Sequence, residues 1–445
     1  MSQVATIEDL ERELPSVLNE HATETQLANI LESKVPPLRC VGEDWFIYGN
    51  GVWSKTSREQ FKPLALSIQH QKTRTARKAT EILKHLEFSK QTDGKEFRSF
   101  HFEDEKGEIL LNCKNCVLGV SAFGIRKLEH SENYHFTGQV AANFNPEADA
   151  PDFERALQFS LPDPKDIDLL RCFCGYILVP DCRYRVALVC YGPTRTGKNT
   201  IAAGIESVLS DDLVTHISLT QLSDPNSKNL AKLAGSALNL ASELKAIEVS
   251  SENFKQLVGS EGIEVDRKYR DSVSLFNTAK FWFNANHLPR FSDGSDAEAA
   301  RLHFLRFDHQ VSEIDETLKE RIRSGRDGVF NFMLDGLRTL LAKRKFPEPS
   351  QRSVETKERF TLHNDPIKEF ITTKCKTGAK LRIEKTQLFE AYKAFCDDNE
   401  IPYGENSNRW FFRELKARYQ FETIRPSCGL EGRPRELAGI GLRDD

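Results

Sequence analysis

The amino-acid sequence predicts an α/β protein in which a parallel sheet forms the core and a smaller domain lies on each side. The first observation is a unit at 186–209, where an apolar run, a glycine-bracketed loop and a segment with helical spacing follow one another. The second is that two more apolar runs, 237–243 and 280–286, each end in a polar side chain. The third is a pair of turn-rich breaks, at 145–151 and 346–350.

The length and charge of the chain set its organisation. A chain of 445 residues corresponds to three domains at about 150 residues each. The breaks place them at 1–150, 151–346 and 357–445. Lysine and arginine number 62 against 66 acidic residues, so the net charge of −4 gives no general affinity for nucleic acid. Any contact with DNA must come from local basic patches.

Neither a targeting segment nor a zinc site is indicated. No apolar run approaches the ~18 residues of a membrane span, and the early acidic residues do not resemble a signal peptide. We therefore expect a soluble, intracellular protein. Of the ten cysteines, Cys113 and Cys116 have zinc-like spacing but lack a second pair, so no zinc site is expected.

The loop after the first apolar strand predicts a nucleotide site. Gly192 and Gly197 allow the backbone to curl so that its N–H groups point at phosphates, and the helix N-terminus adds its positive end. Lys198 follows at the position that reaches the β- and γ-phosphates. The nucleotide-binding residues expected from this P-loop pattern are Gly192, Pro193, Thr194, Arg195, Thr196, Gly197, Lys198, Asn199 and Thr200.

One position departs from the pattern. The residue after the lysine, normally a Ser or Thr that binds Mg²⁺, is Asn199, and the hydroxyl comes one position later at Thr200. Successive helical residues point about 100° apart, so Thr200 does not simply take over the role. The second apolar strand ends in Glu243, an acid that orients a water or holds Mg²⁺ in NTPases. Asn199 or Thr200, together with Glu243, are therefore the expected Mg²⁺ ligands.

Two further places in the central domain carry basic residues: a predicted hairpin and a single arginine before a strand. An alternating segment at 263–273 predicts a hairpin that carries Arg267, Lys268 and Arg270 near its tip. In the core, Arg301 precedes an apolar strand at 302–307, and helices are expected at 312–325 and 328–345.

The sequence of the last domain predicts a winged helix. Three helices at 365–374, 385–397 and 407–419 precede a glycine-rich hairpin at 429–443. The third helix carries Arg409, Arg413 and Lys416, which favour DNA contact over a protein-docking role.

The sequence of the first domain predicts a mixed α+β fold. Amphipathic helices are expected within 1–35, a short β unit at 38–56 and a basic helical stretch at 60–90. Short strands are expected within 108–145, the last of them at 136–144.

The ordered set of motifs resembles the superfamily-3 helicases, most closely the branch of phage and plasmid primase–helicases and poxvirus primase–helicases. The resemblance covers about 38–443 and rests on Gly192–Thr200, Leu238–Glu243, the Lys268 hairpin and Phe283–Phe291, with flanking likeness at 111–118, 144–149, 364–366 and 439–443.

This resemblance implies an AAA+-like sheet and a ring, usually a hexamer. By position, Lys198 would bind the phosphates, Glu243 would be the Walker B acid and Lys268 the DNA-contacting residue. Asn286 would be the sensor on the γ-phosphate or its water. Arg301 would be the arginine finger, although Ala300 stands where the family often has a second arginine.

The implied function is an ATP- and Mg²⁺-dependent DNA helicase of a phage- or plasmid-type mobile element, translocating on single-stranded DNA during replication in the cytoplasm of a bacterial or phage-infected cell. Single-stranded and forked DNA and a separate primase or polymerase are the expected partners. Residues 1–110 are too short for a primase domain and lack a paired acidic motif, so primase activity is not expected. Two alternatives stay open: an origin-melting initiator without processive unwinding, and a DNA-binding scaffold with a weak nucleotide site.

Overall fold

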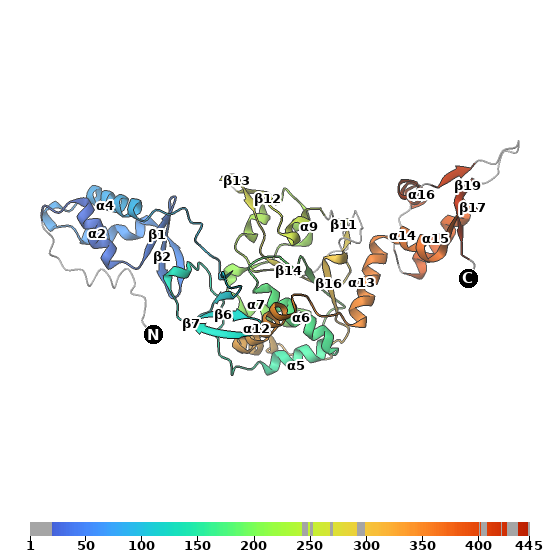
Figure 1. Cartoon of the computed structure of the whole chain (residues 1–445), viewed down its shortest axis with the longest axis horizontal. Coiled ribbons are helices and arrows are strands. Elements are labelled where there is room, and N and C mark those ends of the chain that lie inside the picture. The colour runs from blue at the N-terminus through green and yellow to red at the C-terminus, as the bar shows by residue number, and fades with distance from the viewer. Residues whose placement is uncertain are drawn as a thin grey trace.

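The structure, a computed structural model, arranges the chain in three parts along one long axis, with the N-terminal part at one end and the C-terminal part at the other (Figure 1). The residues it describes are 20–242, 248–249, 252–267, 270–291, 299–399, 401, 407–419, 421–424 and 435–443. The expected helical segment before residue 20 lies outside them.

The N-terminal part begins with a small helical layer on an antiparallel sheet. Trp45, Phe61 and Ile82 are buried between these layers, so the tryptophan serves as core. The helices are α2 (Glu24–Lys34), α3 (Lys62–Ser67) and α4 (Ala76–Ser89), and the strands are β1 (Leu38–Val41), β2 (Asp44–Gly49) and β3 (Val52–Thr56).

A second antiparallel sheet follows and packs on the central part. Its strands are β4 (His101–Glu103), β5 (Ile109–Asn112), β6 (Val117–Ser121) and β7 (Gly124–Leu128). The strand expected at 136–144 was wrong, because this segment pairs only through an isolated bridge at Phe136. Its backbone bonds go instead to separate elements: Val140 N–H donates to Asn112 and Ala141 N–H donates to Val208. These contacts satisfy the backbone without a ladder.

The central part contains a five-stranded parallel sheet, which confirms the predicted α/β core. In spatial order the strands are β16 (Leu302–Arg306), β8 (Ala187–Tyr191), β14 (Lys280–Ala285), β10 (Leu238–Ser242) and β9 (Val214–Thr215). The strands are buried on both faces, as expected for a parallel sheet covered by helices.

Helices cover both faces of this sheet (Figure 1). Leu188 and Trp282 face one hydrophobic cluster, whereas Val189 and Phe281 face the other. The first cluster includes side chains of α5 (Pro151–Ser160), α6 (Pro164–Ile177), α7 (Lys198–Val208), α11 (Leu318–Ser324) and α12 (Arg326–Lys343). The second includes α8 (Leu219–Ser223), α9 (Glu252–Gly259) and α13 (Gln351–Asn364).

Smaller elements complete the central part. The predicted hairpin is present as β12 (Ile263–Arg267) and β13 (Arg270–Leu275). A two-residue pair joins β11 (Glu248–Val249) to β15 (Arg290–Phe291). Short 3₁₀ turns lie at 58–61, 71–73, 132–134, 211–213 and 228–233.

In the C-terminal part, the described residues form three helices and a three-stranded antiparallel sheet. They follow one another as α14 (Pro366–Lys374), β17 (Cys375–Glu384), α15 (Lys385–Asp398), α16 (Ser407–Arg418), β18 (Glu422–Ile424) and β19 (Glu436–Leu442). The three helices agree with the sequence, but α13 and β17 were not expected. Most residues of β17 are exposed, so it lacks the apolar alternation that would have revealed a strand.

Helices α6 and α12 cross with almost no space between their backbones. A Cβ at Gly336 would lie 1.8 Å from the Arg171 carbonyl oxygen, and one at Gly175 would lie 2.1 Å from the Leu337 nitrogen. Both contacts are with backbone, which cannot rotate away. This crossing fixes the helical layer beneath the sheet.

We expect Gly336→Ala to destabilise the protein by about 2 kcal/mol, or about 4–8 °C in Tm. Overpacking costs about 1–3 kcal/mol, and we take the upper end because the clash is with backbone. The better helix propensity of alanine returns about 1 kcal/mol of this cost, and the net loss of stability lowers Tm by the amount given. Thermal unfolding followed by circular dichroism measures the change. Gly124→Ala is the matched control, because its Cβ would meet nothing within 4 Å, and an equal loss in both variants would contradict the interpretation.

Candidate nucleotide-binding site

The segment that joins β8 to α7 and includes the first residues of α7 (the 192–200 loop) can be built only with glycine at two positions. Gly192 has φ +152°, and a Cβ there would lie 1.9 Å from the Phe307 carbonyl oxygen. Gly197, with φ +87°, is the N-cap of α7, and its Cβ would lie 2.1 Å from the Ser160 hydroxyl oxygen. Arg195 also has a positive φ, +63°. The expected strand–loop–helix unit is therefore confirmed.

The segment after β16 holds the loop from one side. Phe307 N–H donates to the Tyr191 carbonyl at 2.8 Å, and Val311 N–H donates to the Arg195 carbonyl at 2.9 Å. The Gln310 side-chain amide donates to the Thr194 carbonyl at 3.0 Å. These bonds hold the end of β8 and the loop against the residues that follow β16.

The Lys198 side chain folds back and donates hydrogen bonds to the loop. Its Nζ donates to the carbonyl oxygens of Gly192 and Pro193, both at 2.6 Å, and to the Thr196 hydroxyl at 3.3 Å. Burial lowers the pKa of this ammonium. The cation is thus held at the loop by neutral acceptors, which an anionic ligand could replace or supplement.

A cavity of about 210 Å³ lies over the loop. Its lining combines the ends of two strands, β10 and β14, with the 192–200 loop and the start of α7. It therefore lies at the carboxyl edge of the sheet, where ligands bind in open α/β folds. The lining residues are Thr194–Thr200, Ser242, Asn284, Asn286 and Lys319. The structure therefore brings the predicted Asn286 to the predicted loop.

Asn284 was missed by the sequence interpretation. It is buried in β14, where its amide accepts a hydrogen bond from Trp282 Nε1 at 2.8 Å and donates one to Asn199 Oδ1 at 2.8 Å. A polar side chain inside a continuous apolar strand was the signal that could have revealed it.

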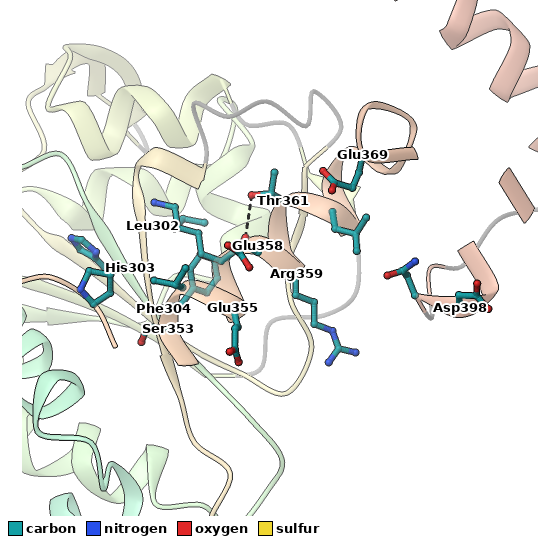
Figure 2. Close-up of a pocket in the computed structure, with 15 residues that line it drawn as sticks. Leu302, His303, Phe304, Ser353, Glu355, Glu358, Arg359, Thr361, Glu369 and Asp398 are labelled. Atoms are coloured by element: carbon teal, nitrogen blue, oxygen red, sulfur yellow. Dashed lines mark hydrogen bonds between the residues drawn. The ribbon is translucent and has the colours of Figure 1, made fainter. Parts of the chain in front are cut away.

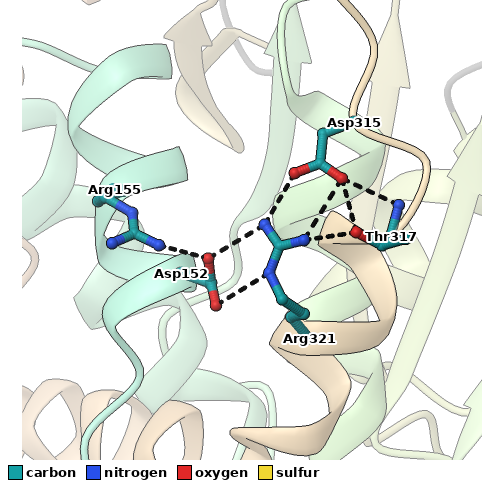
Figure 3. Close-up of polar contacts among 5 residues, drawn as sticks. All are labelled: Asp152, Arg155, Asp315, Thr317 and Arg321. Carbon is teal, nitrogen blue, oxygen red and sulfur yellow. Dashed lines mark hydrogen bonds and ion pairs between the residues drawn. The ribbon is translucent and has the colours of Figure 1, made fainter.

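Lys319 was also missed. It lies on α11, which Figure 3 shows tied to α5 through Arg321. The Arg321 guanidinium donates to Asp315 at 2.8 Å and to Asp152 at 3.3 Å, and it holds the pKa of both carboxyls below the ordinary value. This network fixes the helix that brings Lys319 to the cavity.

Other predicted residues lie elsewhere. Arg301 directly precedes β16, and its carbonyl accepts a bond from Ala187 N–H at 2.8 Å. Because β16 and β8 run parallel in register from Leu302 and Ala187, Arg301 lies at the amino edge of the sheet, opposite the 192–200 loop. Glu243 and Lys268 fall outside the described residues.

The remaining basic residues lie in two other elements. Arg267 ends β12 and Arg270 begins β13 on the hairpin. Arg409, Arg413 and Lys416 are exposed on α16 of the C-terminal part.

A larger cavity, about 960 Å³, opens between β16, α13 and the C-terminal part (Figure 2). The charged residues of its lining are four acids, Glu355, Glu358, Glu369 and Asp398, and two cations, Lys357 and Arg359. This excess of negative charge would repel phosphate. Burial lowers the pKa of His303 to about 4, so this side chain adds no positive charge at neutral pH. The smaller cavity is the better phosphate site despite its size.

Within the described residues, no group of three or more His, Cys, Asp or Glu side chains is placed to hold a metal ion. In the same part of the chain, no helix is both long and apolar enough to cross a lipid bilayer.

Known proteins match both the loop and the whole fold. A family of unknown function (DUF5906) matches residues 190–301. An A-form apo structure of the C-terminal region of NrS-1 is 14% identical, with a TM-score of 0.53, covering 95% of this chain and 100% of that one. An apo structure of NrS-1 residues 305–718 is 13% identical, with the same TM-score and coverage. The chain thus shares its mixed α/β fold with this region.

Proposed function

We propose that the chain is the ATP-driven DNA helicase motor of a phage- or plasmid-type replication protein. One observation carries the proposal: a glycine-bracketed loop with a buried lysine shares a cavity with Asn286 at the carboxyl edge of a parallel sheet. The motif resemblance to superfamily-3 helicases supplies the substrate, DNA. The AAA+-like core and the C-terminal winged helix belong to this proposal.

The loop would bind the phosphates of ATP. The cavity is smaller than the about 300–1,000 Å³ of most ligand pockets, so it suits the phosphates, with the base and sugar outside. Lys198 would contact the β- and γ-phosphates, Asn286 would sense the γ-phosphate, and Glu243 would activate the attacking water. Mg²⁺ bound with ATP would neutralise charge on the phosphates.

A ring would complete the site. Arg301 is separated from its own loop by the length of β16, so within one subunit it does not reach the bound phosphates. In a ring, usually a hexamer in this family, it would face the nucleotide of a neighbour. Its guanidinium would there stabilise charge that develops during hydrolysis.

DNA would be contacted at two places. The hairpin with Arg267, Lys268 and Arg270 would line the pore and grip the backbone of a single strand. The exposed α16 face with Arg409, Arg413 and Lys416 would bind forked DNA. A separate primase or polymerase would act on the strands produced.

The two alternative functions predict different experimental results. An origin-melting initiator would hydrolyse ATP without displacing a long labelled strand, and a scaffold would show no DNA-stimulated hydrolysis. Strand displacement on forks of both polarities therefore tests the proposal directly.

We expect Lys198→Ala to raise the Kd for ATP and abolish hydrolysis, because it removes the buried cation of the loop. Glu243→Gln should keep binding and lose turnover, since it retains shape but not the base. Calorimetric titration and phosphate release measure the two properties. Wild-type turnover in Glu243→Gln would reject the assignment of that acid.

Lys319→Ala should weaken ATP binding about 5-fold, because a partly exposed charge contact with phosphate contributes about 1 kcal/mol. Lys343→Ala is the control, since Lys343 ends α12 and does not line the cavity. The same calorimetric titration applies. Equal Kd values for the two variants would show that Lys319 does not contribute to ATP binding.

Arg301→Ala subunits should bind ATP but hydrolyse it far more slowly, since arginine fingers contribute about 10³–10⁵ in rate. Mixing them with Lys198→Ala subunits should restore part of the activity, because an intact loop then faces an intact arginine. Phosphate release from the mixture measures this. Full activity of Arg301→Ala alone would leave the residue a structural role only.

A further inference from the structure

Three side chains form a hydrogen-bonded line that runs from the core to the cavity. Trp282 Nε1 contacts the Asn284 amide at 2.8 Å, and the other end of that amide contacts the Asn199 amide at 2.8 Å. Trp282 and Asn284 are buried in β14, and Asn199 lies in the first turn of α7 and lines the cavity. Neighbouring strand and helix are thereby joined at the 192–200 loop.

The chemistry of the tryptophan fixes the direction of every bond in this line. An indole N–H only donates, so the Asn284 oxygen must face Trp282 and its NH₂ group must face Asn199. Asn199 must then present its oxygen to that NH₂ group. The opposite orientation of Asn284 would place two buried donors against each other, which native interiors avoid.

The remaining end of the Asn199 amide is its NH₂ group. Among the described residues the structure gives this group no hydrogen-bond partner, and the side chain is exposed at the cavity. We propose that Asn199 is a hydrogen-bond donor to nucleotide phosphate and not a Mg²⁺ ligand, with Asn284 and Trp282 as its positioning residues. This inference rests on the proposed function and names the role of one residue in it.

Metal chemistry agrees with this assignment. Mg²⁺ is a hard cation that takes oxygen ligands, and an amide nitrogen is not one. The oxygen of Asn199 is already turned towards Asn284, whereas the hydroxyls of Thr200 and Ser242 remain in the lining. Phosphate, in contrast, accepts N–H donors readily at a helix N-terminus. Asn199 would therefore strengthen nucleotide binding even without metal.

The test measures ADP binding to the full chain by calorimetry, once in EDTA and once across a Mg²⁺ titration. Asn199→Ala should raise the Kd for ADP in EDTA about 10-fold, as expected when a hydrogen bond to a charged group is lost. The Mg²⁺ concentration for half-maximal binding should stay unchanged. Asn226→Ala, an exposed position outside the cavity, is the control and should match wild type.

A metal ligand would behave in the opposite way. Unchanged binding of Asn199→Ala in EDTA, with an increased Mg²⁺ requirement, would overturn the inference. Failure of wild type to bind ADP under either condition would instead overturn the proposed nucleotide site, so the two failures are distinguishable.

Trp282→Phe tests the positioning role. It keeps the aromatic ring but removes the donor that orients Asn284, so the Asn199 amide is no longer fixed. We expect the Kd for ADP in EDTA to rise about 3-fold, less than for Asn199→Ala because the donor itself remains. Circular dichroism verifies folding. A folded variant with wild-type Kd would show that the indole does not orient the line.

Discussion

Two close contacts of glycines in the 192–200 loop constrain the central part of the molecule. The Phe307 carbonyl and the Ser160 hydroxyl each occupy the space that a side chain would need at Gly192 and Gly197. The loop is therefore in direct contact with the end of β16 and the end of α5. Close packing of this kind allows no gradual adjustment, because a shift in either neighbour moves the loop.

The helical layer carries this constraint further. The glycine crossing of α6 and α12 fixes one pair of helices, and Arg321 ties α11 to α5 at Asp152. Exposed ion pairs add little stability, about 0–1 kcal/mol each. The value of Arg321 is geometric, since it bonds Asp152, Asp315 and Thr317 at once and so sets the position of α11.

The sequence was sufficient where a local pattern determines structure. The 192–200 loop, the strands before and after it and the hairpin at β12 and β13 all follow from glycine placement and apolar runs. Lys319 could not be predicted, because only the fold brings it within reach of a loop more than 100 residues earlier. The segment 136–144 looked like a strand but finds its bonding partners on separate elements. Glu243 and Lys268 stay predictions.

In the proposed ring, strand β16 would link one subunit to the next. Arg301 stands at its amino end. Its carboxyl end continues into the residues that bond Tyr191 at the end of β8 and Arg195 in the 192–200 loop. Five extended residues span about 16 Å, and their hydrogen-bonded pairing with β8 along the whole strand keeps them from stretching. In a ring of the kind proposed, β16 would be a rigid connection between the nucleotide of a neighbouring subunit and the nucleotide of its own subunit. A movement of Arg301 at hydrolysis would reach the next loop without any change in secondary structure.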